Sequence, residues 1–140
     1  MLRIAVTMVC FISCASAFAQ PATPEAVVRA NSAAFNAQDV AALAATVAED
    51  FVWFNVEGEK ITAETRGREA LRTGMAGYFK SLPSAKSEIE SISVNGAFVS
   101  VKERAKWKSK SGEDRSQAAL AIYEVREGLI KRVWYFPSQK

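Results

Sequence analysis

The chain has 140 residues, a formal net charge of +3 and no histidine. This length suits a single domain, and so small a positive charge is too weak for a nucleic-acid-binding surface. Without histidine, the usual serine–histidine and cysteine–histidine nucleophiles are excluded. Any catalysis has to use carboxylates, lysine, tyrosine or bound water.

The first nineteen residues have the pattern of a cleaved signal peptide. Arg3 supplies a positive start, an apolar run follows, and Ala17–Ala19 fits the small-x-small rule for cleavage. We therefore expect residues 1–19 to be a signal peptide and residues 20–140 to be one exported domain, periplasmic or secreted. The apolar run is too short for a finished transmembrane helix, which needs about 20 residues, so no membrane span is expected.

Two other interpretations of this segment stay open. One is a buried N-terminal helix or strand, and the other is a lipid anchor at Cys14, because the four residues that end there loosely resemble a bacterial lipobox. Phe11 fits that motif poorly, so cleavage near Ala19-Gln20 is preferred. Both cysteines, Cys10 and Cys14, then leave with the signal peptide. With neither thiolate nor imidazole ligands we expect no metal and no cofactor.

Three helices are predicted in the first part of the domain. Thr23 caps the first, with Pro24 at its first position, and Asp39 caps the second. The first helix carries an asparagine within its apolar face, which comprises Val27, Val28, Asn31, Ala34 and Phe35. The inner face of the second is Val40, Leu43, Ala44 and Val47. The third starts near Gly67, ends at Pro83, and has apolar residues at helical spacing, namely Leu71, Met75, Tyr78, Phe79 and Leu82.

Strands dominate the rest. One strand is predicted over 51–56, between the second and third helices, with a turn at 57–60. Strands over about 87–94, 99–108, 117–126 and 129–136 follow, with hairpin turns at Asn95-Gly96 and Glu127-Gly128. Helices gathered first and long antiparallel strands gathered last predict an α+β fold.

In this order the signals resemble the nuclear transport factor 2-like superfamily, and within it the SnoaL-like and ketosteroid-isomerase-like branches. The segments that carry the resemblance are Phe35–Asp39, Glu49–Phe51, Arg66–Leu71, Val94–Gly96 and Tyr123–Ile130. The resemblance implies a cone-shaped, curved antiparallel sheet packed on three N-terminal helices and enclosing a pocket. It also implies a homodimer through the outer sheet face, where Ile122, Arg132, Trp134 and Phe136 lie.

The resemblance argues against the best-known chemistry of this fold. The tyrosine donor, the aspartate base and the second aspartate of the steroid isomerases fall on Asn31, Asn55 and Ala121 of this chain. None of the three is retained, and an amide cannot act as a base near neutral pH. Cyclase relatives use an aspartate and a histidine, and this chain has no histidine.

Glu103 is the candidate general acid or base. Odd-numbered residues of its strand are predicted to face inward, which places this carboxylate among Val99, Val101, Ala105 and Trp107. A tight turn at Asn95-Gly96 would place Glu88 directly opposite, whereas a bulge would undo that pairing. The alternative is that Glu103 is ion-paired at the rim of the cavity. On the opposite face of the strand lies a basic stripe of Lys102, Arg104, Lys106 and Lys108. It is either solvated, or paired with acids on neighbouring strands such as Glu124, or a surface for an anionic partner.

We expect a ligand pocket lined by Asn31, Trp53, Asn55, Met75, Tyr78, Val101, Glu103, Trp107, Ala121, Tyr123 and Tyr135. The alternative is that the aromatic residues are ordinary core and the asparagines satisfy nearby backbone groups. Three functions follow. The chain binds a small, largely apolar molecule without established catalysis; or it is a cofactor-free isomerase, lyase or hydrolase that uses Glu103, with Asn55 or Tyr123 as donor; or it is an interaction module whose pocket is filled. Whether it is an enzyme stays open, and the missing catalytic residues favour a binding role.

Overall fold

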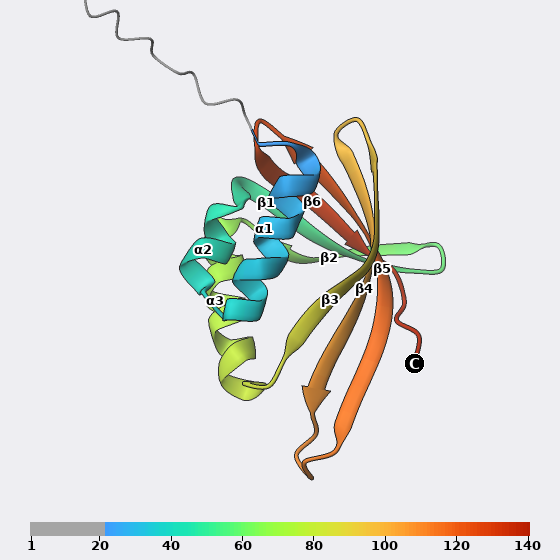
Figure 1. Cartoon of the computed structure of the whole chain (residues 1–140). Coiled ribbons are helices and arrows are strands. Elements are labelled where there is room, and N and C mark those ends of the chain that lie inside the picture. Colours follow the sequence, from blue (N-terminus) through green and yellow to red (C-terminus); the bar gives the residue numbers. More distant parts are fainter. Residues whose placement is uncertain (1–21) are drawn as a thin grey trace, which may run out of the picture.

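The computed structural model describes residues 22–140 (Figure 1). The predicted signal peptide, its cleavage site and the lipobox alternative at Cys14 lie outside the described residues. The elements in chain order are α1 (Pro24–Ala37), α2 (Val40–Ala45), β1 (Val47–Glu57), β2 (Lys60–Arg66), α3 (Arg68–Ser81), β3 (Lys86–Asn95), β4 (Phe98–Lys108), β5 (Asp114–Arg126) and β6 (Leu129–Tyr135). The predicted α+β class is confirmed. Within the described part, no helix is long and apolar enough to span a membrane.

The predicted helix caps are confirmed. The Thr23 hydroxyl accepts the backbone N–H of Ala26 at 3.2 Å, and the Asp39 carboxylate accepts that of Ala42 at 2.9 Å. Each side chain thereby satisfies a backbone donor that the first turn of a helix leaves free. Between the two helices, Gln38 adopts a left-handed backbone conformation with φ of 55° and ends α1.

The second helix is shorter than its sequence pattern predicts. Val47 belongs to β1 instead of the helix, and it is 1% exposed. Hydrogen bonds to distant residues hold the chain in the sheet at this point. The Ile130 N–H donates to the Thr46 carbonyl at 2.9 Å. The Arg68 guanidinium donates twice to the Val47 carbonyl, at 2.8 and 3.0 Å. Neither partner is near Val47 in sequence, so local periodicity could not show where the helix ends.

The strands form one six-stranded sheet in the order β2-β1-β6-β5-β4-β3. Neighbouring strands are antiparallel except β1 and β6, which run parallel. Strand β2 was not predicted. Its β-branched residues Ile61, Thr62 and Thr65 follow the turn at Gly58, which has φ of 61°, and that pattern is the signal that could have shown it.

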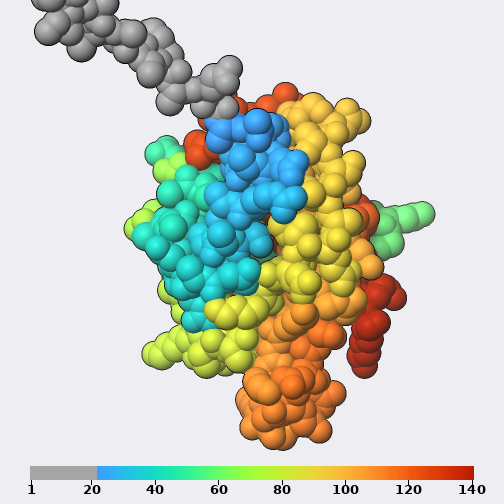
Figure 2. Space-filling view, in the orientation of Figure 1, coloured from blue at the N-terminus to red at the C-terminus, as the bar shows by residue number. Residues whose placement is uncertain are grey.

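The helices cover one face of a strongly curved sheet (Figure 1). Apolar side chains of both layers meet in the core, and the largest fully buried ones are Ile130, Val28, Val47, Val99 and Val101. The hairpin between β4 and β5 extends beyond the helices, as the orange atoms of Figure 2 show. Its outer end therefore has no helix to pack against, whereas the middle of the sheet lies directly under α1 and α3.

Candidate functional site

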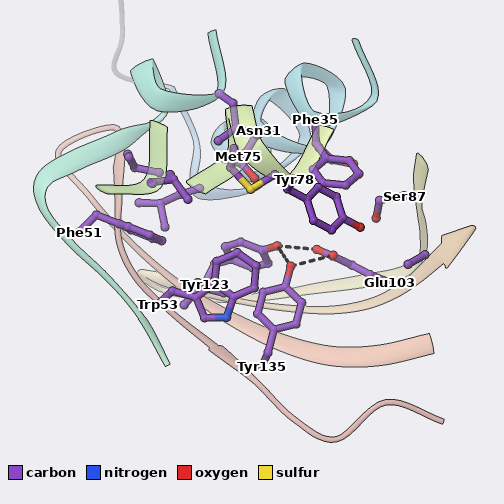
Figure 3. A pocket seen from close by; sticks show the side chains of 17 residues that line it. Asn31, Phe35, Phe51, Trp53, Met75, Tyr78, Ser87, Glu103, Tyr123 and Tyr135 are labelled. Carbon is purple, nitrogen blue, oxygen red and sulfur yellow. Dashed lines mark hydrogen bonds between the residues drawn. The ribbon is translucent and has the colours of Figure 1, made fainter. Parts of the chain in front are cut away.

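A cavity of about 220 Å³ lies between the helices and the concave face of the sheet (Figure 3). The helices contribute the residues of its upper wall, namely Asn31, Ser32, Phe35, Leu43, Leu71, Met75 and Tyr78. The strands contribute the opposite wall, namely Val47, Phe51, Trp53, Ser87, Glu103, Ala105, Tyr123, Ile130, Val133 and Tyr135. The cavity therefore lies where the curved sheet and the helix layer do not pack completely against each other.

The structure brings together seven of the residues predicted to line a pocket. They are Asn31, Trp53, Met75, Tyr78, Glu103, Tyr123 and Tyr135. The strand residues among them follow the period-two alternation that the sequence shows, since Glu103 and Ala105 of β4 both point inward. Met75 and Tyr78 are three residues apart and lie on one face of α3, whereas Asn31 comes from α1.

Four predicted pocket residues do not line the cavity. Val101 and Ala121 are cross-strand partners, and both have 0% exposure within the packed core. Trp107 lies too far along β4, beyond the helices, beside a shallow surface depression with Ser84 and Lys108. Asn55 lies past the cavity on β1. The sequence therefore predicted correctly which face of a strand points inward, but it did not show where along the strand the cavity ends.

The two asparagines are occupied by the protein itself. Asn55 accepts the indole N–H of Trp53 at 3.2 Å and donates to Glu64 at 3.2 Å. Asn31 does reach the cavity, and its amide donates to the Thr46 hydroxyl at 2.8 Å. Asn55 consequently orients Trp53 instead of contacting a ligand.

Several lining residues were predicted only as core. Phe35, Leu43 and Leu71 were placed on the inner faces of helices, and Phe51 was placed at the start of a strand. The sequence signal for a core residue and for a cavity-lining residue is the same inward periodicity. Ser87, a small polar residue on the otherwise apolar wall, had no signal of its own.

Glu103 is held by two tyrosines. Tyr123 Oη donates to Glu103 Oε1 at 2.5 Å, and Tyr135 Oη donates to Oε2 at 2.9 Å. The two hydroxyl oxygens are themselves 2.8 Å apart, so the three side chains form a closed triangle of contacts (Figure 3). The tyrosines come from neighbouring strands, β5 and β6, in which Tyr123 lies opposite Val133 and Ala121 lies opposite Tyr135.

Burial raises the pKa of the Tyr123 hydroxyl well above its ordinary value of 10.0, and the charges of Tyr135 and Glu103 act in the same direction. Burial and the charge of Glu103 likewise raise the pKa of Tyr135 well above 10.0. Loss of a proton from either hydroxyl would place a second negative charge beside the carboxylate in a region with little water. Both tyrosines therefore stay protonated and act as hydrogen-bond donors at neutral pH.

The carboxylate pair predicted for Glu103 is absent. Ile89, not Glu88, is the Cα partner of Glu103, because the hairpin turns at Gly96-Ala97 and the register shifts between Ile89 and Ser91. Glu88 lies opposite Arg104 on the other face, where it forms an ion pair with Lys106. A single-residue shift in register moves a side chain to the other face of the sheet.

The alternative of an ion-paired Glu103 is also wrong. None of the ion pairs among residues 22–140 includes Glu103. It is the one charged residue among those that line the cavity. Over the same described range, no group of three or more acidic, histidine or cysteine side chains is placed to hold a metal ion.

The outer face of the sheet carries ion pairs and an apolar patch. Lys102 and Arg104 pair with Glu90, and Lys108 pairs with Asp114. The basic stripe is thus paired with acids of neighbouring strands, as one interpretation expects, although not with Glu124, which pairs with Arg126 and Arg132 instead. We define the outer apolar patch as Phe54, Leu120, Ile122, Trp134 and Phe136. The rings of Phe54 and Trp134 stack within it at 5.7 Å.

Comparison with known families gives one match. The sequence model of the SnoaL-like domain matches residues 28–133, which is most of the chain and includes both walls of the cavity except Tyr135. No curated protein matches the sequence.

Solved structures share the fold. An uncharacterised cystatin-fold protein from Novosphingobium aromaticivorans is 24% identical, with a TM-score of 0.73 over 83% of this chain and 99% of that one. IdmH, a putative polyketide cyclase from Streptomyces antibioticus, is 20% identical, with a TM-score of 0.71 over 84% and 93%. A hypothetical protein with a ketosteroid isomerase-like fold from Catenulispora acidiphila, solved in complex with trimethylamine, is 18% identical, with a TM-score of 0.69 over 83% and 87%.

Proposed function

The chain belongs to the SnoaL-like domain family, and we propose that it binds a small, largely apolar molecule in the cavity between its helices and its sheet. The observation that carries this proposal is the cavity itself: its walls are mostly aliphatic and aromatic, with a few polar side chains among them, namely Asn31, Ser32, Ser87 and Glu103. Ligand sites in proteins have this composition, because apolar walls give affinity while a few polar groups fix orientation.

The size of the cavity limits the ligand. At about 220 Å³ it is smaller than the 300–1,000 Å³ or so that is usual for drug-sized ligands. A molecule of a few to about ten non-hydrogen atoms is therefore the expected occupant. The Catenulispora acidiphila neighbour was solved with a ligand of that order, trimethylamine, although the low identity carries only the fold over to this chain.

Native mass spectrometry of the protein purified from its own compartment tests this proposal. We expect a co-purifying small molecule that is lost in a Met75→Trp variant, because Met75 lines the cavity and the larger indole would fill it. Ala76→Trp, one residue away on the exposed side of α3, is the matched control and should retain the molecule. Equal retention by both variants would place the ligand elsewhere and overturn the proposal.

A second candidate is cofactor-free acid–base catalysis by Glu103. It is supported by one observation: a carboxylate lies inside an apolar cavity next to Tyr123, a protonated hydroxyl donor. In an isomerase, Glu103 would remove a proton from one carbon of the substrate and return it to another, while a hydroxyl donor stabilises the intermediate oxyanion. If a substrate is found by screening, Glu103→Gln should lower kcat by at least about 100-fold. Unchanged turnover would remove this candidate.

The interaction-module alternative required a cavity filled by side chains, and the cavity is open. The outer apolar patch, however, supports a proposal about assembly. We propose a homodimer in which this patch packs against its counterpart in a second copy. Leu120 and Phe136 are 44% and 36% exposed, and Trp134 and Ile122 lie next to each other across β6 and β5. Apolar area that is rimmed by charged residues is typical of protein interfaces.

We also propose that the domain is exported after cleavage between Ala19 and Gln20. The support is the pattern of charge, apolar run and small residues in the first nineteen residues. Intact mass measurement of the protein expressed in a bacterial host tests it. A mass that begins at Gln20 is expected, whereas a lipid adduct that begins at Cys14 would establish the anchored alternative.

A further inference from the structure

The charge inside the cavity has no counter-charge among the described residues. Glu103 is the one charged side chain among the lining residues, and none of the ion pairs of residues 22–140 includes it. Its two hydrogen-bond donors are neutral hydroxyls. They fix the carboxylate in place, yet they leave its negative charge uncompensated, and a carboxylate oxygen can accept more than one hydrogen bond.

Binding of a neutral apolar ligand would leave the negative charge of Glu103 less well stabilised than in the free protein. It would displace water from the cavity, and an unpaired charge that loses water without gaining a partner raises the free energy of the complex. An anionic ligand would be repelled by Glu103 and would find no lysine or arginine on the walls. A ligand that carries one positive charge removes both difficulties.

The rest of the cavity suits a cation as well. Phe35 and Tyr78 lie on the helix side with ring centroids 6.1 Å apart, and Trp53 and Tyr135 stack at 4.9 Å on the sheet side (Figure 3). Tyr123 adds a fifth ring, edge-on to Tyr135 at 6.3 Å. The faces of aromatic rings attract cations, most strongly for tryptophan and where water is excluded. Aromatic rings on two opposite walls together with one carboxylate form an aromatic cage.

From these observations we infer that the cavity selects a small organic cation, an ammonium group with apolar substituents, and holds it between Glu103 and the aromatic cage of Phe35, Trp53, Tyr78, Tyr123 and Tyr135. This inference rests on the proposed binding function and narrows it from an apolar molecule to a cationic one. The alkyl groups of the ligand occupy the apolar part of the cavity, and its charge lies toward the carboxylate.

A pair of probes that differ in charge alone tests the inference. Choline and 3,3-dimethylbutan-1-ol have nearly the same shape, with a quaternary nitrogen in the first where the second has a quaternary carbon. Isothermal titration calorimetry with the exported domain should show choline binding at least about tenfold more tightly, the effect of a desolvated cation–aromatic contact added to an ion pair. Equal affinities would overturn the cation preference and leave the proposed binding function standing.

Two cavity variants and one exposed control locate the effect. Glu103→Gln keeps the size of the side chain and should reduce the preference for choline by at least about threefold, to the part that the aromatic cage contributes, whereas Glu59→Gln removes the same charge from an exposed turn and should leave the preference intact. Phe35→Leu keeps an apolar wall without the ring, and should weaken choline binding by a larger factor than binding of the alcohol. Thermal unfolding confirms that each variant is folded.

Two further outcomes of these experiments would contradict the cation inference. A preference for choline that is unchanged in both Glu103→Gln and Phe35→Leu places the cation outside this cavity and overturns the inference. If neither probe binds at millimolar concentration, the cation inference fails for ligands of this size. The proposed binding function is then judged on its own by the molecule that co-purifies in native mass spectrometry.

Discussion

At the scale of single residues, the triangle of Glu103, Tyr123 and Tyr135 is the feature with the most chemical consequence. Three side chains from adjacent strands meet at distances of 2.5 to 2.9 Å. Both hydroxyl protons are donated to the carboxylate, one to each of its oxygens, so the two tyrosines hold Glu103 from two sides. The triangle thus fixes the direction in which the carboxylate faces the cavity.

The strength of this triangle can be measured. Tyr135→Phe removes one of the two donors to a partly buried carboxylate, and hydrogen bonds to charged groups contribute about 1.5–3 kcal/mol. We therefore expect the free energy of unfolding to fall by about 2 kcal/mol in chemical denaturation. Tyr78→Phe is the control, because Tyr78 is 37% exposed as a residue and loss of its hydroxyl should change stability by less than about 0.5 kcal/mol.

A double-mutant cycle separates the hydrogen bond from packing. When Glu103 is replaced by leucine, no carboxylate accepts the hydrogen bond from Tyr135. Tyr135→Phe should then lower the free energy of unfolding by much less than it does in the natural chain. An equal cost in both backgrounds would show that the tyrosine stabilises the fold through its ring alone.

At the scale of elements, the outer ion pairs couple neighbouring strands. Glu124 of β5 lies opposite Arg132 of β6 and is only 11% exposed in its side chain. The hydrogen bond from Arg132, followed by that from Arg126, lowers the pKa of the Glu124 carboxyl below its ordinary value of 4.5, although burial opposes the shift. A carboxyl group whose pKa is lower in the folded than in the unfolded state stabilises the fold above the unfolded pKa. That stabilisation is lost as the pH falls through the folded value.

Glu124→Gln should therefore be less stable than the natural chain at neutral pH, by about 1 kcal/mol. The difference should shrink as the pH falls below about 4.5, because both chains then carry a neutral group at this position. Urea titrations at a series of pH values measure it. A difference that persists at low pH would mean that the arginines contribute through packing, and Glu59→Gln serves as the exposed control.

Local sequence signals predicted most of the helices and strands, but they predicted less well the residues at which these elements end. The caps at Thr23 and Asp39 and the turn at Glu127-Gly128 depend on neighbouring residues, and the sequence predicted them correctly. The turn predicted at Asn95-Gly96 lies one residue later in the structure, at Gly96-Ala97. The end of α2 and the existence of β2 depend on contacts with distant segments, such as Arg68 with the Val47 carbonyl. Sequence patterns describe a segment's own preferences, whereas strand pairing depends on which partner the fold supplies.

At the scale of the whole molecule, the tyrosines make the stability of the fold depend on pH in the alkaline range. The chain has three tyrosines, and burial raises the pKa of all of them. Because the folded pKa lies above the unfolded one, the stability contributed by each is complete below about pH 10 and is lost as the pH rises toward the folded value. Tyr123 and Tyr135 should each lower the free energy of unfolding by about 1.4 kcal/mol per pH unit in that range.

Tyrosinate absorbance followed together with circular dichroism checks this. We expect little tyrosinate at pH 10 and a cooperative rise at higher pH that coincides with loss of the native fold. Absorbance that rises in the folded protein with an ordinary midpoint would contradict the burial of these hydroxyls. A Tyr123→Phe variant should show a smaller alkaline loss of stability.

The proposed dimer is also a property of the whole molecule. Trp134→Glu places a charge in the centre of the outer apolar patch, and burial of an unpaired charge at an interface is unfavourable. We expect light scattering to show monomers for this variant and dimers for the natural chain. Val94→Glu is the control, since Val94 is 45% exposed and lies opposite Val99, on the inward side of the sheet. Monomers of the natural chain at high concentration would rule out the dimer.

By itself the sequence determined the fold class, the helix caps, the hairpin turn at Glu127-Gly128 and the inward face of β4, because these depend on the spacing and chemistry of adjacent residues. The tertiary structure alone decided that Glu103 meets Tyr123 and Tyr135 instead of Glu88. It also decided that the cavity stops short of Val101, Ala121 and Trp107. The physical reason is that register and bulges are set between strands, and a cavity is the space that packing of the whole chain leaves unfilled.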